Sequence, residues 1–152
     1  DDKGDLHIIV DPTKEKIEAF EGNVIHALAF GPGLVIDGVR QTEYPLDSYA
    51  AEMDTQRLVL CQMAPLSYLI IATEGPENKG SKGLTLDQFS QLMYDLGAIN
   101  AYNLDGGQSS MLWYGGEVIS TPHKGGRPVG DIVYIKDLPK ATSNVEKTSE
   151  GN

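Results

Sequence analysis

The sequence has little cysteine, little positive charge and no long apolar run. Cys61 is the only cysteine, so the chain can form neither an internal disulfide nor a cysteine metal cluster. Lysine and arginine number 12 against 22 acidic residues, which gives a net charge of −10. That balance argues against a nucleic-acid surface and against electrostatic docking on anionic membranes. No apolar run reaches membrane-spanning length, and the three histidines show no metal-ligand spacing.

Length and composition fit one folded domain followed by a polar tail. A chain of 152 residues can bury a core, and we expect a single domain over residues 1–136. Residues 137–152 are rich in polar side chains, and we expect them to be disordered. The chain begins at Asp1 without Met or a signal peptide, which is typical of a processed or trimmed product. No residue pattern indicates a cofactor or a metal.

Hydrophobic periodicity predicts an α+β domain with one main helix. Residues 85–96 carry apolar side chains at three- and four-residue spacing, with a capping box at Thr85 and a stop at Gly97. Residues 41–55 indicate an irregular surface loop, and residues 24–30 are ambiguous between strand and short helix. The predicted strands are 6–10, 17–20, 34–36 with 39, 57–62, 68–73, 99–102, 111–114, 117–120 and 131–135. Because strands far outnumber helices, we expect a mixed or largely antiparallel sheet with the 85–96 helix packed on it.

A polar, glycine-containing segment follows the apolar run 99–102. It reads Asn103-Leu104-Asp105-Gly106-Gly107-Gln108-Ser109-Ser110. The two glycines permit positive φ and the close approach of another molecule to the main chain, and exposed N–H groups in such a turn can bind an anion. Asp105 would stand at a strand end, where polar groups converge on a ligand. Asp-Gly and Gly-Gly are also common hairpin signals, so a tight hairpin turn remains an alternative.

Five segments in order resemble the phosphodiester glycosidase family, which includes the uncovering enzyme that removes N-acetylglucosamine from lysosomal mannose phosphodiesters. Residues 103–110 resemble the "NLDGGGSS" signature of that family. The other four segments are Phe30-Gly31-Pro32-Gly33-Leu34-Val35, Gln56-Arg57-Leu58, Gly83-Leu84-Thr85-Leu86 and Gly126-Arg127-Pro128-Val129. Together they span roughly residues 24 to 135. The family also contains bacterial members described as exopolysaccharide-related.

The resemblance implies a hydrolase that cleaves a sugar-1-phosphodiester between the sugar carbon and the phosphate oxygen. A carboxylate near that carbon would stabilise an oxocarbenium-like transition state, and guanidinium groups would bind the phosphate. Asp105 is the expected catalytic carboxylate, with Glu74 and Asp131 as the next candidates. Arg57 and Arg127 are the expected phosphate clamps. The remaining candidates for sugar hydroxyls or phosphate oxygens are Asn103, Gly106, Gly107, Gln108, Ser109 and Ser110.

Two departures from the family pattern qualify this expectation. The family domain carries an Asn-Gly-containing segment before the region matched by residues 24–35, and this chain lacks it. A fragment completed by a missing segment or a second chain, or a shortened variant, would account for that difference. Glu74-Gly75-Pro76 stands where the family usually has a "DGR"-like segment, so the arginine of that segment has no counterpart.

Two readings from other functional classes stay open. A carbohydrate-binding or exopolysaccharide-associated module could keep the fold without catalysis, and a plain protein–protein module would place Arg57 and Arg127 on separate surfaces. In an enzyme, both arginines and Asp105 should converge on one cleft. The expected partner is a phosphorylated glycan, and the expected location is secreted or in the cell envelope.

Overall fold

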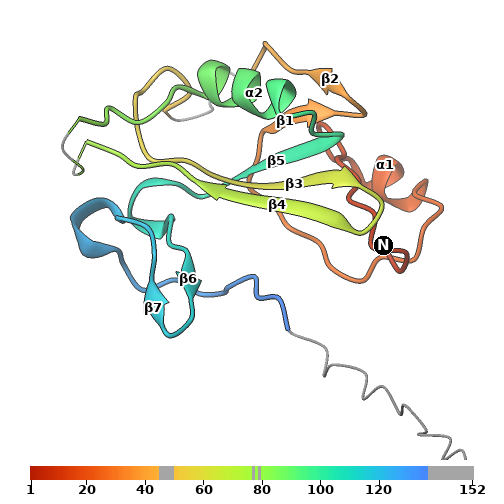
Figure 1. Cartoon of the computed structure of the whole chain (residues 1–152). Helices are drawn as coiled ribbons and strands as arrows, with labels where there is room; N and C mark the ends of the chain where they lie inside the picture. Colours follow the sequence, from red (N-terminus) through yellow and green to blue (C-terminus); the bar gives the residue numbers. More distant parts are fainter. Residues whose placement is uncertain (45–49, 77, 79, 137–152) are drawn as a thin grey trace, which may run out of the picture.

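A computed structural model describes residues 1–44, 50–76, 78 and 80–136. The elements in chain order are α1 Lys14–Glu18, β1 Gly33–Ile36, β2 Val39–Arg40, β3 Leu58–Ala64, β4 Ser67–Ala72, α2 Leu86–Asp95, β5 Asn100–Leu104, η1 Gly107–Ser109, β6 Trp113–Tyr114, β7 Glu117–Val118 and η2 His123–Gly125. Five strands form one sheet in the order β2-β1-β5-β3-β4, and every pairing is antiparallel. Figure 1 shows α2 above this sheet and the separate β6–β7 hairpin below it. The α+β fold with one main helix is confirmed.

Local sequence signals fix both ends of α2. The Thr85 hydroxyl accepts the Gln88 N–H while the Gln88 side chain accepts the Thr85 N–H, which completes the predicted capping box. At the other end Gly97 has φ +83°, a value that glycine adopts without strain. The Gly97 N–H donates to Tyr94, and the next N–H donates to Met93, as in a Schellman motif. The helix expected over residues 85–96 is therefore confirmed.

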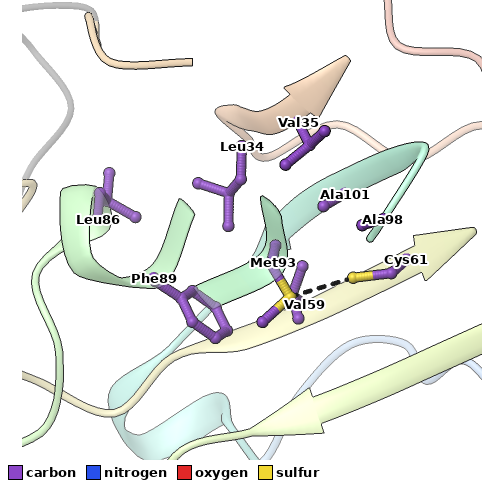
Figure 2. Packing of buried hydrophobic residues seen from close by; sticks show 9 residues of the cluster. All are labelled: Leu34, Val35, Val59, Cys61, Leu86, Phe89, Met93, Ala98 and Ala101. Carbon is purple, nitrogen blue, oxygen red and sulfur yellow. Dashed lines mark hydrogen bonds between the residues drawn. The ribbon is translucent and has the colours of Figure 1, made fainter. Parts of the chain in front are cut away.

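The hydrophobic core lies between α2 and one face of the sheet. Its buried members are Leu34, Val35, Val59, Cys61, Leu86, Phe89, Met93, Ala98 and Ala101. Figure 2 shows the α2 side chains directed at those of β1, β3 and β5. Burial raises the pKa of the Cys61 thiol to about 12, so this thiol stays protonated at neutral pH.

Strand β5 occupies the centre of the sheet. It pairs with β1 on one side, where Val35 faces Ala101, and with β3 on the other, where Val59 faces Asn103. The strand continues through Leu104, two residues beyond its predicted end. The chain leaves the sheet at Asp105 only after both neighbours have fixed the strand's position.

Three predicted strands are wrong. Residues 14–18 form α1 because Thr13 caps a run of good helix formers, so no strand covers residues 17–20. Residues 6–10 stay outside the sheet ladders, since the Gln62 and Asn100 side chains bond the N–H and C=O of Leu6 at 2.8 and 2.9 Å. Residues 131–135 are exposed and pair with no strand among the described residues.

The remaining predictions divide by region. The hairpins 34–39 and 111–120 and the strands 57–62 and 68–73 are confirmed within one or two residues. Residues 24–30, left ambiguous, are irregular, and so are the described residues of 41–55 apart from a single bridge at Thr55. The predicted tail 137–152 lies outside the described residues. Among the helices in the described part of the chain, none is long and apolar enough to cross a membrane.

Arg57 is buried and holds irregular backbone together. Its side chain donates to the carbonyls of Ala50 at 2.5 Å, Met53 at 2.8 Å and Leu84 at 2.9 Å. The residue is only 5% exposed, and burial lowers the pKa of the guanidinium while the nearby Asp54 carboxylate opposes that shift. The three carbonyls use the planar fork that only arginine offers. Arg57 therefore anchors residues 50–53 to the start of α2.

Replacing Phe89 with Ala should destabilise the fold by about 3–5 kcal/mol, because it leaves a cavity in a fully buried site. Urea unfolding followed by circular dichroism would measure the change. Leu92→Ala on the same helix is the matched control, because Leu92 is 38% exposed and should lose far less. Equal losses for the two variants would contradict the placement of the core.

Replacing Arg57 with Lys should lower the free energy of unfolding by about 1–3 kcal/mol, because an ammonium cannot span all three carbonyls and leaves part-buried acceptors unpaired. The same urea experiment applies. Arg127→Lys is the comparison, since the Arg127 side chain is 52% exposed and its ion pair should add under about 1 kcal/mol. An Arg57→Lys protein as stable as wild type would refute the anchoring role.

Candidate functional site

The signature loop, residues 103–110, lies at the end of β5 and is not a hairpin turn. Strand β5 pairs with β1 and β3, which both precede it in the chain, and not with the strand that follows the loop. That next strand, β6, pairs with β7. After Asp105 the chain enters the short 3-10 helix η1, Gly107–Ser109. The alternative of a tight Asp-Gly hairpin is therefore wrong.

The two glycines of the signature loop answer different demands. Gly107 has φ +55°, and a Cβ there would meet no other atom. Glycine therefore suits this position because of the backbone conformation and not because of space. Gly106 has an extended backbone, but a Cβ there would collide with the Gln56 carbonyl oxygen. The close approach expected at Gly106 is thus made by the chain's own backbone and not by another molecule.

An exposed trio joins the signature loop to the segment 121–128, here named the Arg127 loop. Arg127 Nη2 donates to Asp105 Oδ2 at 2.5 Å, and Arg127 Nε donates to Ser109 Oγ at 2.6 Å. The side chains of Asp105 and Arg127 are 43% and 52% exposed. A soluble molecule can therefore reach the paired carboxylate and guanidinium, and Ser109 beside them is partly exposed.

Gln56, which the sequence reasoning did not select, ties the two loops together. It precedes β3 and is 2% exposed. Its side-chain amide donates to the Thr121 carbonyl and accepts the His123 N–H at 2.5 Å, while its main-chain carbonyl accepts the Gly107 N–H at 3.1 Å. No sequence signal singles out a lone glutamine next to a strand, except that it lies in the segment Gln56-Arg57-Leu58, which resembles the family.

Arg57 does not join the trio. Its backbone abuts the signature loop, since its carbonyl accepts the Ser110 hydroxyl at 3.4 Å. Its guanidinium lies instead against the carbonyls of residues 50–53 and Leu84. The expectation that Arg57 clamps a phosphate beside Arg127 is corrected accordingly, because Arg57 is only 5% exposed and its Nε and Nη2 donate to backbone carbonyls. The two arginines and Asp105 therefore do not converge on one cleft.

Two more predicted binding residues are buried. Asn103 is 3% exposed and donates from Nδ2 to the Gly31 carbonyl at 2.8 Å, while its Oδ1 has no partner among the described residues. Ser110 is 1% exposed. Gln108 is partly exposed on the loop. The N–H groups of Gly107, Ser109 and Ser110 bond inside the protein and so do not form the suggested anion nest.

The other two candidate carboxylates lie away from the trio's hydrogen bonds. Glu74 Oε1 accepts the Thr121 N–H at 3.3 Å, and its Oε2 is buried without a partner among the described residues. Glu74 therefore contacts the Arg127 loop at Thr121 and not at Arg127. Asp131 is exposed and makes no ion pair with the described residues. Among those residues, no three His, Cys, Asp or Glu side chains gather to hold a metal ion.

Comparison with known proteins places this geometry in a family. The family model described as phosphodiester glycosidase matches residues 1–136. Among solved structures, a hypothetical protein from Synechocystis has 26% sequence identity and a TM-score of 0.55. The match covers 64% of this chain and 18% of that one, so the chain spans a small part of that protein's length. No curated protein matches the chain.

The region matched by the family model contains both the signature loop and the Arg127 loop. The matched region contains all of β1 to β7, with the signature loop at the end of the central strand and its Asp105 paired to Arg127 of the family-like segment 126–129. The match also extends over nearly nine-tenths of the 152 residues. The chain belongs to the phosphodiester glycosidase family.

Proposed function

We propose that this protein hydrolyses a sugar-1-phosphodiester, with Asp105 and Arg127 acting on the two ends of the bond that breaks. The observation that carries the proposal is the exposed Asp105–Arg127–Ser109 trio on the signature loop. The family name gives the reaction class, and the trio supplies groups suited to it. A glycan bearing a phosphodiester is the substrate class.

The polarity of the ion pair matches the polarity of the reaction. As the bond between the sugar carbon and the phosphate oxygen lengthens, positive charge grows on the sugar and negative charge on the departing phosphate. A carboxylate beside the sugar and a guanidinium beside the phosphate stabilise those charges together. Asp105 Oδ2 and Arg127 Nη2 are 2.5 Å apart. The breaking bond can therefore have its sugar carbon beside Asp105 and its phosphate oxygen beside Arg127.

Arg127 can hold Asp105 and a phosphate at the same time. A guanidinium has five N–H donors, and the described contacts use one on Ser109 and one on Asp105. The remaining N–H donors, on Nη1 and Nη2, belong to a side chain that is 52% exposed and suit bidentate binding of phosphate oxygens. The ion pair therefore need not break when substrate arrives, and Asp105 keeps its charge and orientation.

Water completes the reaction with atoms in balance. Its oxygen forms a new bond to the sugar carbon, the bond from that carbon to the phosphate oxygen breaks, and a proton passes from water to the products. The leaving phosphomonoester has a second pKa of about 6, so it departs more readily than a sugar alkoxide. Charge neutralisation by Arg127 therefore matters more than a strong general acid.

The proposed setting is the cell envelope or the extracellular space, with an envelope or exopolysaccharide glycan as substrate. The resemblance to exopolysaccharide-related members of the family supports this location and this substrate. The strongly acidic chain, with net charge −10, would repel an anionic glycan except near cations such as Arg127. Local placement of that arginine is thus a condition of binding.

Asp105→Asn should lower kcat by about a hundred- to a thousandfold, because the amide keeps the size but loses the charge that stabilises the sugar cation. Arg127→Lys should lower kcat/KM by about tenfold, because it keeps charge but loses the fork. The measurement is release of free sugar and phosphomonoester from a sugar-1-phosphodiester at equal folded concentration. Reaction in ¹⁸O-labelled water should place the label on the sugar.

Arg40→Lys is the matched control for this experiment. Arg40 makes two contacts of the same kind as Arg127, because its Nε donates to the Ser90 hydroxyl and its Nη2 to the Asp87 carboxylate, but these partners belong to α2. Its activity should stay within twofold of wild type. Label on the phosphate, or equal rates for Asp105→Asn and wild type, would refute the proposed roles. Substrate binding by calorimetry without turnover would favour the carbohydrate-binding module.

A further inference from the structure

We propose that Gln56 is the positioning residue of this site, which sets Asp105 and Arg127 at contact distance without touching the substrate. The inference rests on the proposed function for its catalytic consequence, but its structural part stands apart from it. Gln56 is almost wholly buried, at 2% exposure, and is uncharged, so it takes no direct part in the chemistry. Gln56 connects the signature loop and the Arg127 loop, two stretches of backbone that share no strand pairing among the described residues.

The side chain of Gln56 fixes the Arg127 loop. An amide offers an acceptor and two donors on one rigid plane. Here Oε1 accepts the His123 N–H at 2.5 Å, and Nε2 donates to the Thr121 carbonyl. The two bonds bracket Pro122 and set the direction in which the chain enters η2, four residues before Arg127.

The main chain of Gln56 fixes the signature loop. Its carbonyl accepts the Gly107 N–H at 3.1 Å, and Gly106 packs against the same oxygen with no room for a side chain. Asp105 is the residue immediately before this contact. One buried residue therefore bonds the segments that carry both partners of the ion pair, the signature loop through its main chain and the Arg127 loop through its side chain.

The ion pair cannot supply this order by itself. Both side chains are about half exposed, and exposed pairs of this kind contribute little against side-chain entropy and salt screening. They are also 22 positions apart in the sequence and belong to irregular segments. Buried hydrogen bonds are stronger constraints, because a lost partner leaves a polar group unsatisfied. Gln56 makes such bonds on both sides of the site.

Arginine Nε–H resonances give a direct readout of this positioning. The chain has three arginines, at positions 40, 57 and 127, and each Nε–H donates to a different oxygen of the protein. The Arg127 Nε–H resonance is assigned as the one that disappears in the Arg127→Lys protein. In a ¹⁵N spectrum, Gln56→Met should shift or broaden the Arg127 signal and leave the Arg40 signal in place, while kcat/KM should fall at least tenfold.

Gln62→Met is the matched control, because Gln62 is a second buried glutamine, 4% exposed, near the opposite end of β3. Its amide binds the Leu6 N–H and the Asp5 carboxylate, each at 2.8 Å. This variant loses comparable buried bonds but should leave the Arg127 signal and the kcat/KM unchanged. An Arg127 signal displaced as far by Gln62→Met as by Gln56→Met would overturn the proposal, since general loosening would explain both.

Cys61 reports whether the core stays closed. Its thiol is fully buried under α2, so alkylation at neutral pH should be as slow in Gln56→Met as in wild type. Where Gln56→Met proves unfolded by this measure, Gln56→Glu decides by the same resonance. That variant keeps an acceptor for His123 and loses the donor to Thr121. An unmoved Arg127 signal in the folded variant would overturn the proposal.

The two readouts separate this inference from the proposed function. If the wild-type protein releases no sugar or phosphomonoester, the reaction is refuted. If the Arg127 resonance nevertheless shifts in Gln56→Met and not in Gln62→Met, the positioning role is supported. A wild-type protein that hydrolyses the diester, with activity and resonance untouched by both Gln56 variants, would do the reverse.

Discussion

The two-sided pairing of β5 is the constraint on which the rest of the molecule depends. A central strand has both its hydrogen-bonding edges occupied, here by β1 and β3, so it can shift neither along nor across the sheet. The face of β5 toward α2 contributes Ala101 to the core. The first residue free of both ladders is Asp105. Placement of the site is therefore a consequence of sheet formation and core packing, and only its fine geometry depends on the loops.

Buried polar side chains supply that fine geometry by holding irregular backbone. In each case the side chain bonds main-chain groups of a segment that has no ladder of its own, as an unpaired backbone group in such a place would cost free energy. The pairs of anchor and segment are Gln62 with Asn100 on Leu6, Asn103 on Gly31, Arg57 on residues 50–53, and Gln56 on residues 121–123. These buried polar residues are therefore structural anchors, which distinguishes them from the exposed groups that are the candidates for binding a ligand.

That distinction explains what the sequence could predict and what it could not. The helix at 85–96 was predictable because its cap, periodicity and glycine stop are all local signals. An apolar run such as 131–135 says nothing of its partner, so its strand was a wrong prediction. Motif resemblance located the signature loop and Arg127, but it could not tell that the Arg57 side chain turns toward Leu84. Gln56 carries no local signal, because its role depends on three backbone groups far away in sequence.

A repeated constellation shows why the residue types alone do not identify the site. Arg40 contacts a serine hydroxyl and an aspartate through the same nitrogens that Arg127 uses. Around Arg40, however, the serine is Ser90, which is fully buried in α2, so no substrate can reach its hydroxyl. Around Arg127 the serine lies on a loop whose glycine, Gly107, leaves open space beside the backbone. The signature loop therefore distinguishes the Asp105–Arg127–Ser109 trio from the Arg40 contacts, because it keeps the carboxylate and guanidinium about half exposed and Ser109 partly exposed.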